Sequence, residues 1–480
     1  MTEARIAYKD LKALLDARDY AGCLELSERF IAQRPEHPSG YEFKALALLA
    51  LKRPEAALPA VQQAIRRASP RINGTLWRRA AGVLKAAKTP ATEQAAFWAA
   101  CEGPIEQALE AARQGLLAGD AAAAAATLPG LDEQVFPPEA KDRLAACFAL
   151  LGGTEPDGAA GEDPEAIIAG IRQPPILLAA GMGWSGSSAI FDYLAEFDRV
   201  TAVKGETPFI SRGAVSLASI DAALEKPAQL RVQLVDFLFL NLLGFARITG
   251  GSDLKTFAYA RARSIGAGQM AHLDAVLAYC RLARCLLQAA EPDDRLRAFA
   301  AMVKLVVVRF AIGAEVPAGH YALMDNVVPI AKIGRIGFLT ETTVYCCFRD
   351  PRSNYVSRLR EDVQFVKTPA KFIAELGKAL ERLEKRVEKS ARDPAASCRF
   401  LRVQFEEFIL SERYRDALAR ELGLDLSERQ RHSRLKPWES LRNVMLHQEH
   451  EKPDEIALIE AELGGYCVEP AIRPLSRMPR

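Results

Sequence analysis

Four short runs of apolar and β-branched residues lie in the last two thirds of the chain. They cover residues 176–180, 199–203, 343–348 and 400–405. The first run has no polar alternation, which is typical of a strand buried on both faces of a sheet. Apolar residues at helical spacing follow this first run. Residues 367–392 have the pattern of a charged helix with a solvated outer face. These patterns predict an α/β domain over residues 173–480, a parallel sheet with helices on both faces.

The N-terminal third, residues 1–151, is Ala-rich and has the apolar spacing of helices. Leu24 is matched by Leu58, 34 residues further on, and the same spacing relates Ile31 to Ile65. A helix–turn–helix period of this length resembles tetratricopeptide repeats, so we expect an all-α repeat domain here. Such a stack implies a concave surface for a peptide, a protein partner or a second subunit. A helical bundle without a groove is the alternative.

A segment rich in Gly, Pro and acidic residues separates the two regions and has nothing to bury. We place a linker at residues 152–172. Residues 215–320 have mostly helical periodicity and are expected to cap the sheet. Their most apolar window, residues 232–248, contains Asp236 and is short for a bilayer span, so we expect a core helix and no membrane span.

Composition and charge narrow the class of protein. The chain has 480 residues, enough for two or three domains, and a formal net charge of +2. This near-neutral charge gives no support for a general nucleic-acid or membrane-surface binder. The polar N-terminus shows no targeting signal, so we expect a cytoplasmic protein. The nine cysteines include no C-x-x-C pair, which predicts reduced structural thiols and no zinc site. Three late histidines are expected to be surface residues rather than metal ligands: His432, His447 and His450.

The turn after the first strand combines glycines and serines. Gly181, Gly183 and Gly186 allow a sharp turn and a close approach to a ligand, because they carry no Cβ. Ser187 and Ser188 stand where a helix is expected to begin, and a helix N-terminus attracts anions. The turn is therefore a candidate phosphate cradle, with a plain tight connection as the alternative. Ser187 occupies the position of the Walker Lys, which argues against an ATP- or GTP-cleaving P-loop enzyme.

A second candidate anion site follows residues 343–348. Arg349 lies at the C-terminal end of that strand, where open α/β sheets bind ligands. Asp350 is a good N-cap and Pro351 a good first residue for the next helix. Ser357 lies two turns into this helix, so Arg349 and Ser357 are candidates to hold a phosphate together. A surface salt bridge and a solvent-facing serine are the alternative.

Together the two stretches resemble the sulfotransferase family, which uses 3′-phosphoadenosine 5′-phosphosulfate (PAPS) and releases 3′-phosphoadenosine 5′-phosphate (PAP). The stretch from Arg349 to Ser357 resembles the family's 3′-phosphate motif, Arg-Asp-Pro-Arg, four residues, then Ser. The earlier turn resembles its 5′-phosphosulfate loop and reads Gly183-Trp184-Ser185-Gly186-Ser187-Ser188. The resemblance covers about residues 173–470 and implies a P-loop-like sulfotransferase fold. The family usually has Lys or Arg at the position of Trp184, where it touches the transferring group.

The resemblance also implies a base. In glycosaminoglycan and protein-tyrosine members, a Glu at the position of Glu206 takes the proton of the acceptor hydroxyl, a contribution of about 10²–10⁴-fold. Lys204 is a candidate for the positive charge missing at Trp184. A solvated Lys–Glu pair at the strand end is the alternative. Asp325 and Asn326 lie where many members touch donor and acceptor.

A late basic segment resembles the family's lid over the 3′-phosphate and the adenine. Lys436 and Arg442 are its candidate cations, and Trp438 is a candidate to stack on the adenine. A hydrophobic anchor with flanking cations is the alternative.

The resulting hypothesis is a sulfotransferase that moves a sulfonate group from PAPS to an acceptor hydroxyl or amine, on a glycan or polysaccharide, without a metal. Backbone N–H groups of residues 185–188 would hold the 5′-phosphosulfate, and residues 215–320 would shape the acceptor site. Two alternatives stay open. One is an adaptor protein whose helical repeats work beside a degenerate nucleotide-binding domain. The other is a nucleotide or sugar kinase, which the missing Lys at position 187 disfavours.

Overall fold

The computed structural model describes most of the chain. The described residues are 6–68, 74–90, 92–94, 96–97, 104–131, 138–153, 163–181, 185–203, 208–211, 215–243, 270–313, 315–325, 336–360, 368–392 and 397–468. By their contacts the chain divides into two compact units. The helical unit contains Met1–Ala169 and Gly213–Leu305, and the sheet unit contains Gly170–Arg212 and Val306–Arg480.

This division differs from the expected one over one long segment. The sequence placed residues 173–480 in a single α/β domain, with residues 215–320 capping the sheet. Instead, Gly213–Leu305 groups with the N-terminal helices. Arg231 donates to the carbonyl of Leu151 (2.8 Å), and Arg113 pairs with Asp236 (2.7 Å). Helical periodicity predicts which face of a helix is buried, but it does not identify the neighbour that covers it.

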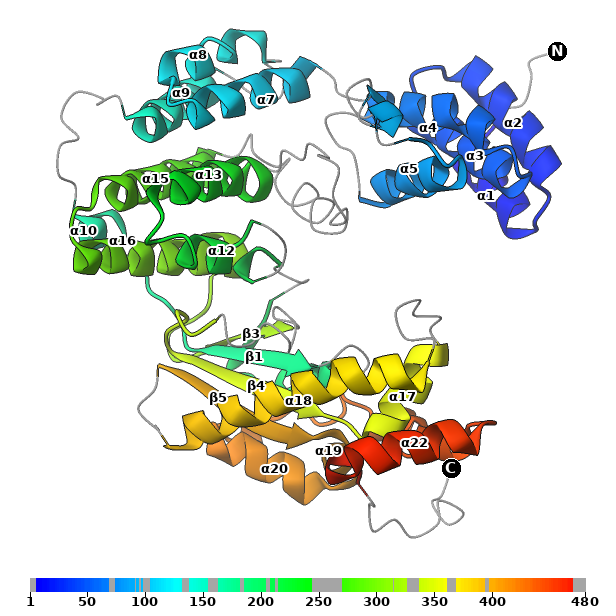
Figure 1. Cartoon of the computed structure of the whole chain (residues 1–480), viewed down its shortest axis with the longest axis vertical. Helices are drawn as coiled ribbons and strands as arrows, with labels where there is room; N and C mark the ends of the chain where they lie inside the picture. Colours follow the sequence, from blue (N-terminus) through cyan, green and yellow to red (C-terminus); the bar gives the residue numbers. More distant parts are fainter. Residues whose placement is uncertain are drawn as a thin grey trace. The chain divides into compact units, whose positions relative to one another are not determined.

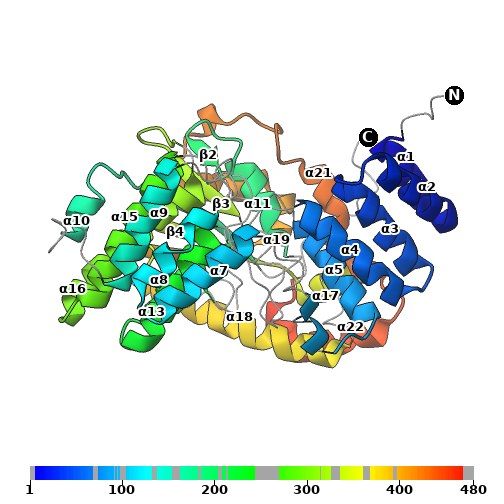
Figure 2. The same ribbon diagram turned by 90° about the horizontal axis from the view of Figure 1, so that it is seen from above.

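Five helices open the helical unit, and each packs on the next (Figure 2). They are α1 (Tyr8–Asp16), α2 (Tyr20–Gln33), α3 (Pro38–Ala50), α4 (Pro54–Ala68) and α5 (Gly74–Ala86). Asp19 caps α2 by accepting from the N–H of Gly22 at 2.9 Å. The starts of α2 and α4 are 34 residues apart, as the period predicts. α3 also contacts α1 and α5, so helices two apart in sequence lie against each other.

The remaining helices of this unit come from two stretches of chain. They are α7 (Pro104–Leu117), α8 (Ala121–Ala125), α9 (Pro138–Gly152), α10 (Pro164–Ile167), α12 (Leu217–Asp221), α13 (Pro227–Phe237), α15 (Met270–Gln288) and α16 (Pro292–Leu305). α9 packs on α15, and α7 packs on α13 (Figure 1). α13 continues as the π-helical turn η3 (Leu238–Leu242), which is buried as predicted for a core segment. No described helix combines the length and hydropathy that a bilayer span requires.

Five parallel strands form the sheet of the second unit, in the order β2-β3-β1-β4-β5 (Figure 1 labels β3, β1, β4 and β5, and Figure 2 labels β2). They are β1 (Ile176–Gly181), β2 (Val200–Ala202), β3 (Tyr321–Asp325), β4 (Thr342–Phe348) and β5 (Cys398–Gln404). The predicted α/β class is confirmed, and four of the strands follow the predicted apolar runs. β3 was not predicted as a strand.

Helices cover both faces of this sheet. One face carries Leu177 and Val403, which pack with α11 (Ser187–Leu194), α19 (Phe405–Leu410) and α20 (Glu412–Glu421). Arg402 points to the other face, because neighbouring strand residues alternate, and it meets Glu384 of α18 (Pro369–Arg392) there at 3.5 Å. The remaining segments of this unit surround these layers. They are η2 (Pro208–Ile210), η4 (Val306–Ile312), α17 (Pro351–Arg360), η6 (Leu426–Glu428), α21 (Pro437–Ser440), η7 (Leu441–Asn443), η8 (Leu446–Glu449), α22 (Pro453–Leu463) and η9 (Gly464–Tyr466).

Candidate functional site

The strand order creates a topological switch point between β1 and β4. These two strands are hydrogen-bonded neighbours. The chain leaves β1 for β2 on one side of the sheet, and it leaves β4 for β5 on the other side. Open parallel sheets bind ligands beyond the carboxyl ends of their strands at such a point. The two candidate motifs of the sequence follow these two strands.

The turn between β1 and α11 is tightly packed where the structure describes it. A Cβ on Gly181 would lie 2.0 Å from Oγ of Ser185. Gly186 has a φ of +87°, and a Cβ there would lie 2.3 Å from two ring carbons of Phe405. Only glycine therefore fits at Gly186, whereas a Cβ on Gly181 would have to displace the hydroxyl of Ser185. Gly183 and Trp184 lie outside the described residues.

The serines of this turn differ in their exposure. Ser185 is only 2% exposed, and its buried Oγ has no hydrogen-bond partner in the described part of the chain. Ser187 is buried as the first residue of α11, whereas Ser188 is exposed. A buried polar group without a partner costs about 1–3 kcal/mol. An anionic ligand seated on this turn would accept from the hydroxyl and remove that cost.

Cys347 ties the turn to β4. Its Sγ donates to the carbonyl of Ser185 at 3.1 Å. Burial raises the pKa of Cys347 to about 12, so the thiol keeps its proton at neutral pH and remains a donor. Cys346 and Cys347 are both buried free thiols, as predicted for cysteines in a buried strand.

Arg349 lies beside the same turn. It is buried directly after β4, and its Nη2 donates to the carbonyl of Asn443 at 2.6 Å. Its guanidinium carbon is 5.2 Å from the ring centroid of Phe405. Since the ring of Phe405 also fills the space beside Gly186, this side chain connects the two candidate motifs.

The electrostatics around Arg349 are those of a desolvated charged group. Burial lowers the pKa of Arg349, while the negative charges of Glu406 and Asp350 act in the opposite direction. Burial also raises the pKa of Glu406, against hydrogen bonds from Gln404 and from the backbone N–H of Asp350. A guanidinium that has lost its water gains more from an anionic partner than an exposed one does.

α17 begins as the sequence predicts. Asp350 is its N-cap, because Oδ1 accepts from the N–H of Arg352 at 2.8 Å, and Pro351 is the first helical residue. Ser357 lies in the second turn of α17 and is half-buried. The structure thus places Arg349 before the first turn and Ser357 one turn after Ser353.

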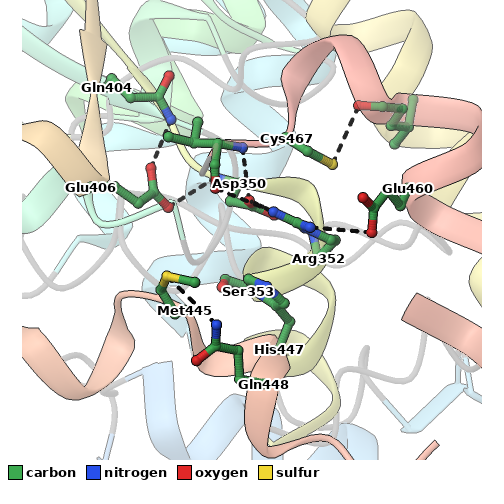
Figure 3. A network of polar contacts seen from close by, with 12 residues as sticks. Asp350, Arg352, Ser353, Gln404, Glu406, Met445, His447, Gln448, Glu460 and Cys467 are labelled. Atoms are coloured by element: carbon green, nitrogen blue, oxygen red, sulfur yellow. Dashed lines mark hydrogen bonds and ion pairs between the residues drawn. The ribbon is translucent and has the colours of Figure 1, made fainter. Parts of the chain in front are cut away.

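His447 does not lie on the surface, contrary to the prediction from the sequence. The sequence predicted a surface histidine, but the ring is buried and its Nδ1 lies 2.9 Å from Oγ of Ser353 on α17 (Figure 3). The serine gives the ring a polar partner in the interior, which a sequence pattern does not reveal. His450 is half-buried beside Glu455, and His432 is exposed as predicted.

The late basic segment is fixed at both of its ends. Oε1 of Glu196, two residues after the end of α11, accepts from the backbone N–H of Leu435 (2.9 Å), and Leu435 is buried. Asn443 accepts from Arg349 at the other end, so the segment reaches the second motif. Lys436 is exposed and pairs with Glu439 at 3.4 Å. Trp438 is 55% exposed, with its ring 5.2 Å from that of His432.

Several expected site residues lie outside the described part of the chain. They are Gly183, Trp184, Lys204, Glu206 and Asn326. Asp325 is the last residue of β3. The sequence did not indicate a site role for Phe405, Cys347 or Asn443, although the position of Phe405 at the end of a predicted strand was a usable signal.

No protein-family model, curated protein or solved structure matches the chain. Among the residues that the structure describes, no group of three or more His, Cys, Asp or Glu side chains is arranged to hold a metal ion. The chemistry of the site is therefore inferred from its residues.

Proposed function

We propose that this chain is a PAPS-dependent sulfotransferase that transfers a sulfonate group to an acceptor hydroxyl or amine, with a glycan or polysaccharide as the acceptor. One observation carries the proposal. The Gly/Ser turn after β1 and Arg349 after β4 meet at the switch point of a parallel sheet, with Phe405 against both. This arrangement supports the proposal, because a donor with a 5′-phosphosulfate and a 3′-phosphate would need two separate anion sites.

The two motifs would divide the donor between them. The first N–H groups of α11 and the hydroxyls of Ser187 and Ser188 would hold the 5′-phosphosulfate. Arg349 and Ser357 would hold the 3′-phosphate, since a guanidinium binds phosphate oxygens in a fork geometry. Lys436 and Trp438 belong to the segment that would close over the nucleotide.

The reaction needs positioning more than covalent chemistry from the protein. The acceptor oxygen attacks sulfur, the bond between sulfur and the phosphate oxygen breaks, and PAP leaves. The acceptor proton passes to Glu206, and Lys204 would stabilise charge on the sulfonate oxygens. Because the charge is spread over those oxygens, fixed donors aimed at them lower the barrier.

Arg349→Gln tests the 3′-phosphate site. The variant is expected to bind PAP about 10- to 100-fold more weakly, because it loses charge-assisted hydrogen bonds to the phosphate. Affinity for ADP, which lacks the 3′-phosphate, is expected to change much less. Calorimetric titration of both nucleotides gives the two affinities.

Arg360→Gln is the matched control, since Arg360 lies on α17 but is exposed and pairs with Glu449 at 2.8 Å. An equal loss of PAP and ADP affinity in Arg349→Gln would contradict the assignment of the 3′-phosphate to this residue.

A further inference from the structure

The described end of the chain folds back onto the second motif. α22 contacts both α17 and α18, and η9 follows it. Tyr355 of α17 donates to Oε2 of Glu455 in α22 at 2.8 Å. The residues after α22 therefore arrive at the first turn of α17.

The second arginine of the motif binds this end of the chain. Oδ2 of Asp350 accepts from Nη2 of Arg352 (2.8 Å) and from the N–H of Val468 (2.9 Å). Nη2 of Arg352 also donates to the carbonyl of Val468 (3.2 Å), and Nη1 pairs with Glu460 at 3.2 Å (Figure 3). Arg352 is only 4% exposed. Its guanidinium is held by two carboxylates and a backbone carbonyl of the protein.

Tyr466, two residues before Val468, makes a second contact between this segment and the sheet unit. Its hydroxyl donates to Oε2 of Glu384 on α18 at 2.9 Å. A row of contacts leads from there along the ends of β5 and β4 back to Asp350. It runs through Glu384, Arg402, Gln404 and Glu406. Residues 466–468 therefore join this row at two points, through Tyr466 and through Val468.

We propose that residues 466–468, which we call the C-terminal brace, help to determine how tightly the donor site binds the 3′-phosphate. The brace holds Asp350 and Arg352, and through them the start of α17 and the adjoining Arg349. Asp350 and Arg352 are positioning residues in this arrangement, since their side chains bind each other and the brace. The inference rests on the proposed function, because it concerns how tightly Arg349 holds a 3′-phosphate.

A single backbone atom gives the sharpest test. Val468→Pro removes the backbone N–H that donates a hydrogen bond to Asp350, and Val468→Ala keeps it. Cys467 has φ −73° and ψ 142°, a conformation that the residue before a proline readily adopts. The proline variant is therefore expected to fold.

The proline variant is expected to bind PAP about tenfold more weakly than the alanine variant, from the loss of one hydrogen bond to a charged group. Calorimetric titration with PAP gives both affinities. A purely structural role would lower thermal stability and leave the affinity of the folded protein unchanged.

The coupling must also run in reverse, because linkage between two sites is reciprocal. Cys467 is half-buried between Tyr466 and Val468, so alkylation of its thiol reports on release of the brace. Saturating PAP is expected to slow this labelling in the wild-type protein. Cys285, half-buried on α15 of the helical unit, is the internal control and is expected to label at an unchanged rate.

The outcomes separate the brace from the proposed function. If the unmodified chain binds PAP, but both Val468 variants bind it equally and PAP leaves Cys467 labelling unchanged, the brace is overturned and the donor site stands. If the unmodified chain does not bind PAP, the proposed function fails and the brace fails with it.

Discussion

Phe405 contacts both candidate motifs, and its ring is the point at which they meet. The guanidinium of Arg349 lies 5.2 Å from the ring centroid, and such a contact contributes about 0.5–2 kcal/mol. The ring also leaves no room for a side chain at Gly186. The sequence predicted that Gly186 turns the chain, but it did not reveal the ring, because the contact comes from the first residue of α19, much later in the chain.

Gly186→Ala is expected to lower the free energy of unfolding by about 2–4 kcal/mol, since it combines a left-handed backbone with a clash against Phe405. Gly423→Ala is the matched control. Gly423 also has a positive φ, of +70°, but no atom lies within 4 Å of an added Cβ. It should therefore lose only about 1–2 kcal/mol. Urea unfolding of both variants gives the comparison, and equal losses would contradict the close packing at Gly186.

At the scale of elements, the sequence predicted β1, β4 and β5 well, because short, continuous apolar runs rich in β-branched and aromatic residues and bounded by turn residues are typical of buried strands. β3 (Tyr321–Asp325) was missed, since a strand of five residues with three buried ones cannot be told from a loop or a helix end. The predicted helix start at Asp350 was correct, because capping is encoded locally. The neighbours of Gly213–Leu305 were not predictable, because packing partners are not local.

Glu406 joins the end of β5 to the start of α17, and this junction predicts a pH dependence. Burial raises the pKa of Glu406. Between its unfolded and folded pKa values, the folded protein binds more protons than the unfolded chain. The free energy of unfolding therefore falls as pH rises through this window, from the ordinary glutamate range up to the raised pKa. Glu406→Gln lacks this proton and keeps an oxygen that can accept from Asp350.

Urea unfolding of wild type and Glu406→Gln at closely spaced pH values measures this effect. Wild type is expected to lose stability relative to the variant across the window, and the difference should level off above it. Glu407→Gln, at the exposed neighbouring position, controls for the loss of a carboxylate. A difference between wild type and Glu406→Gln that does not change with pH would contradict the buried ionisation.

At the scale of the whole molecule, every described residue of the proposed donor site belongs to the sheet unit. The sequence motifs predicted which residues follow β1 and β4. The strand order that makes these two strands neighbours had to come from the structure, because parallel pairing joins distant segments. The helical unit contributes none of the described residues of the proposed donor site. The surface for a protein partner that the sequence predicts on residues 1–151 stays a prediction.

Calorimetric titration of the full chain with PAP, with ADP as the comparison, tests the central claim most directly. The proposed pair of anion sites predicts that PAP binds well and that ADP binds much more weakly, since only PAP carries a phosphate for the proposed site at Arg349. Equal affinities for the two nucleotides, or no binding of PAP, would contradict a donor site built from these two motifs.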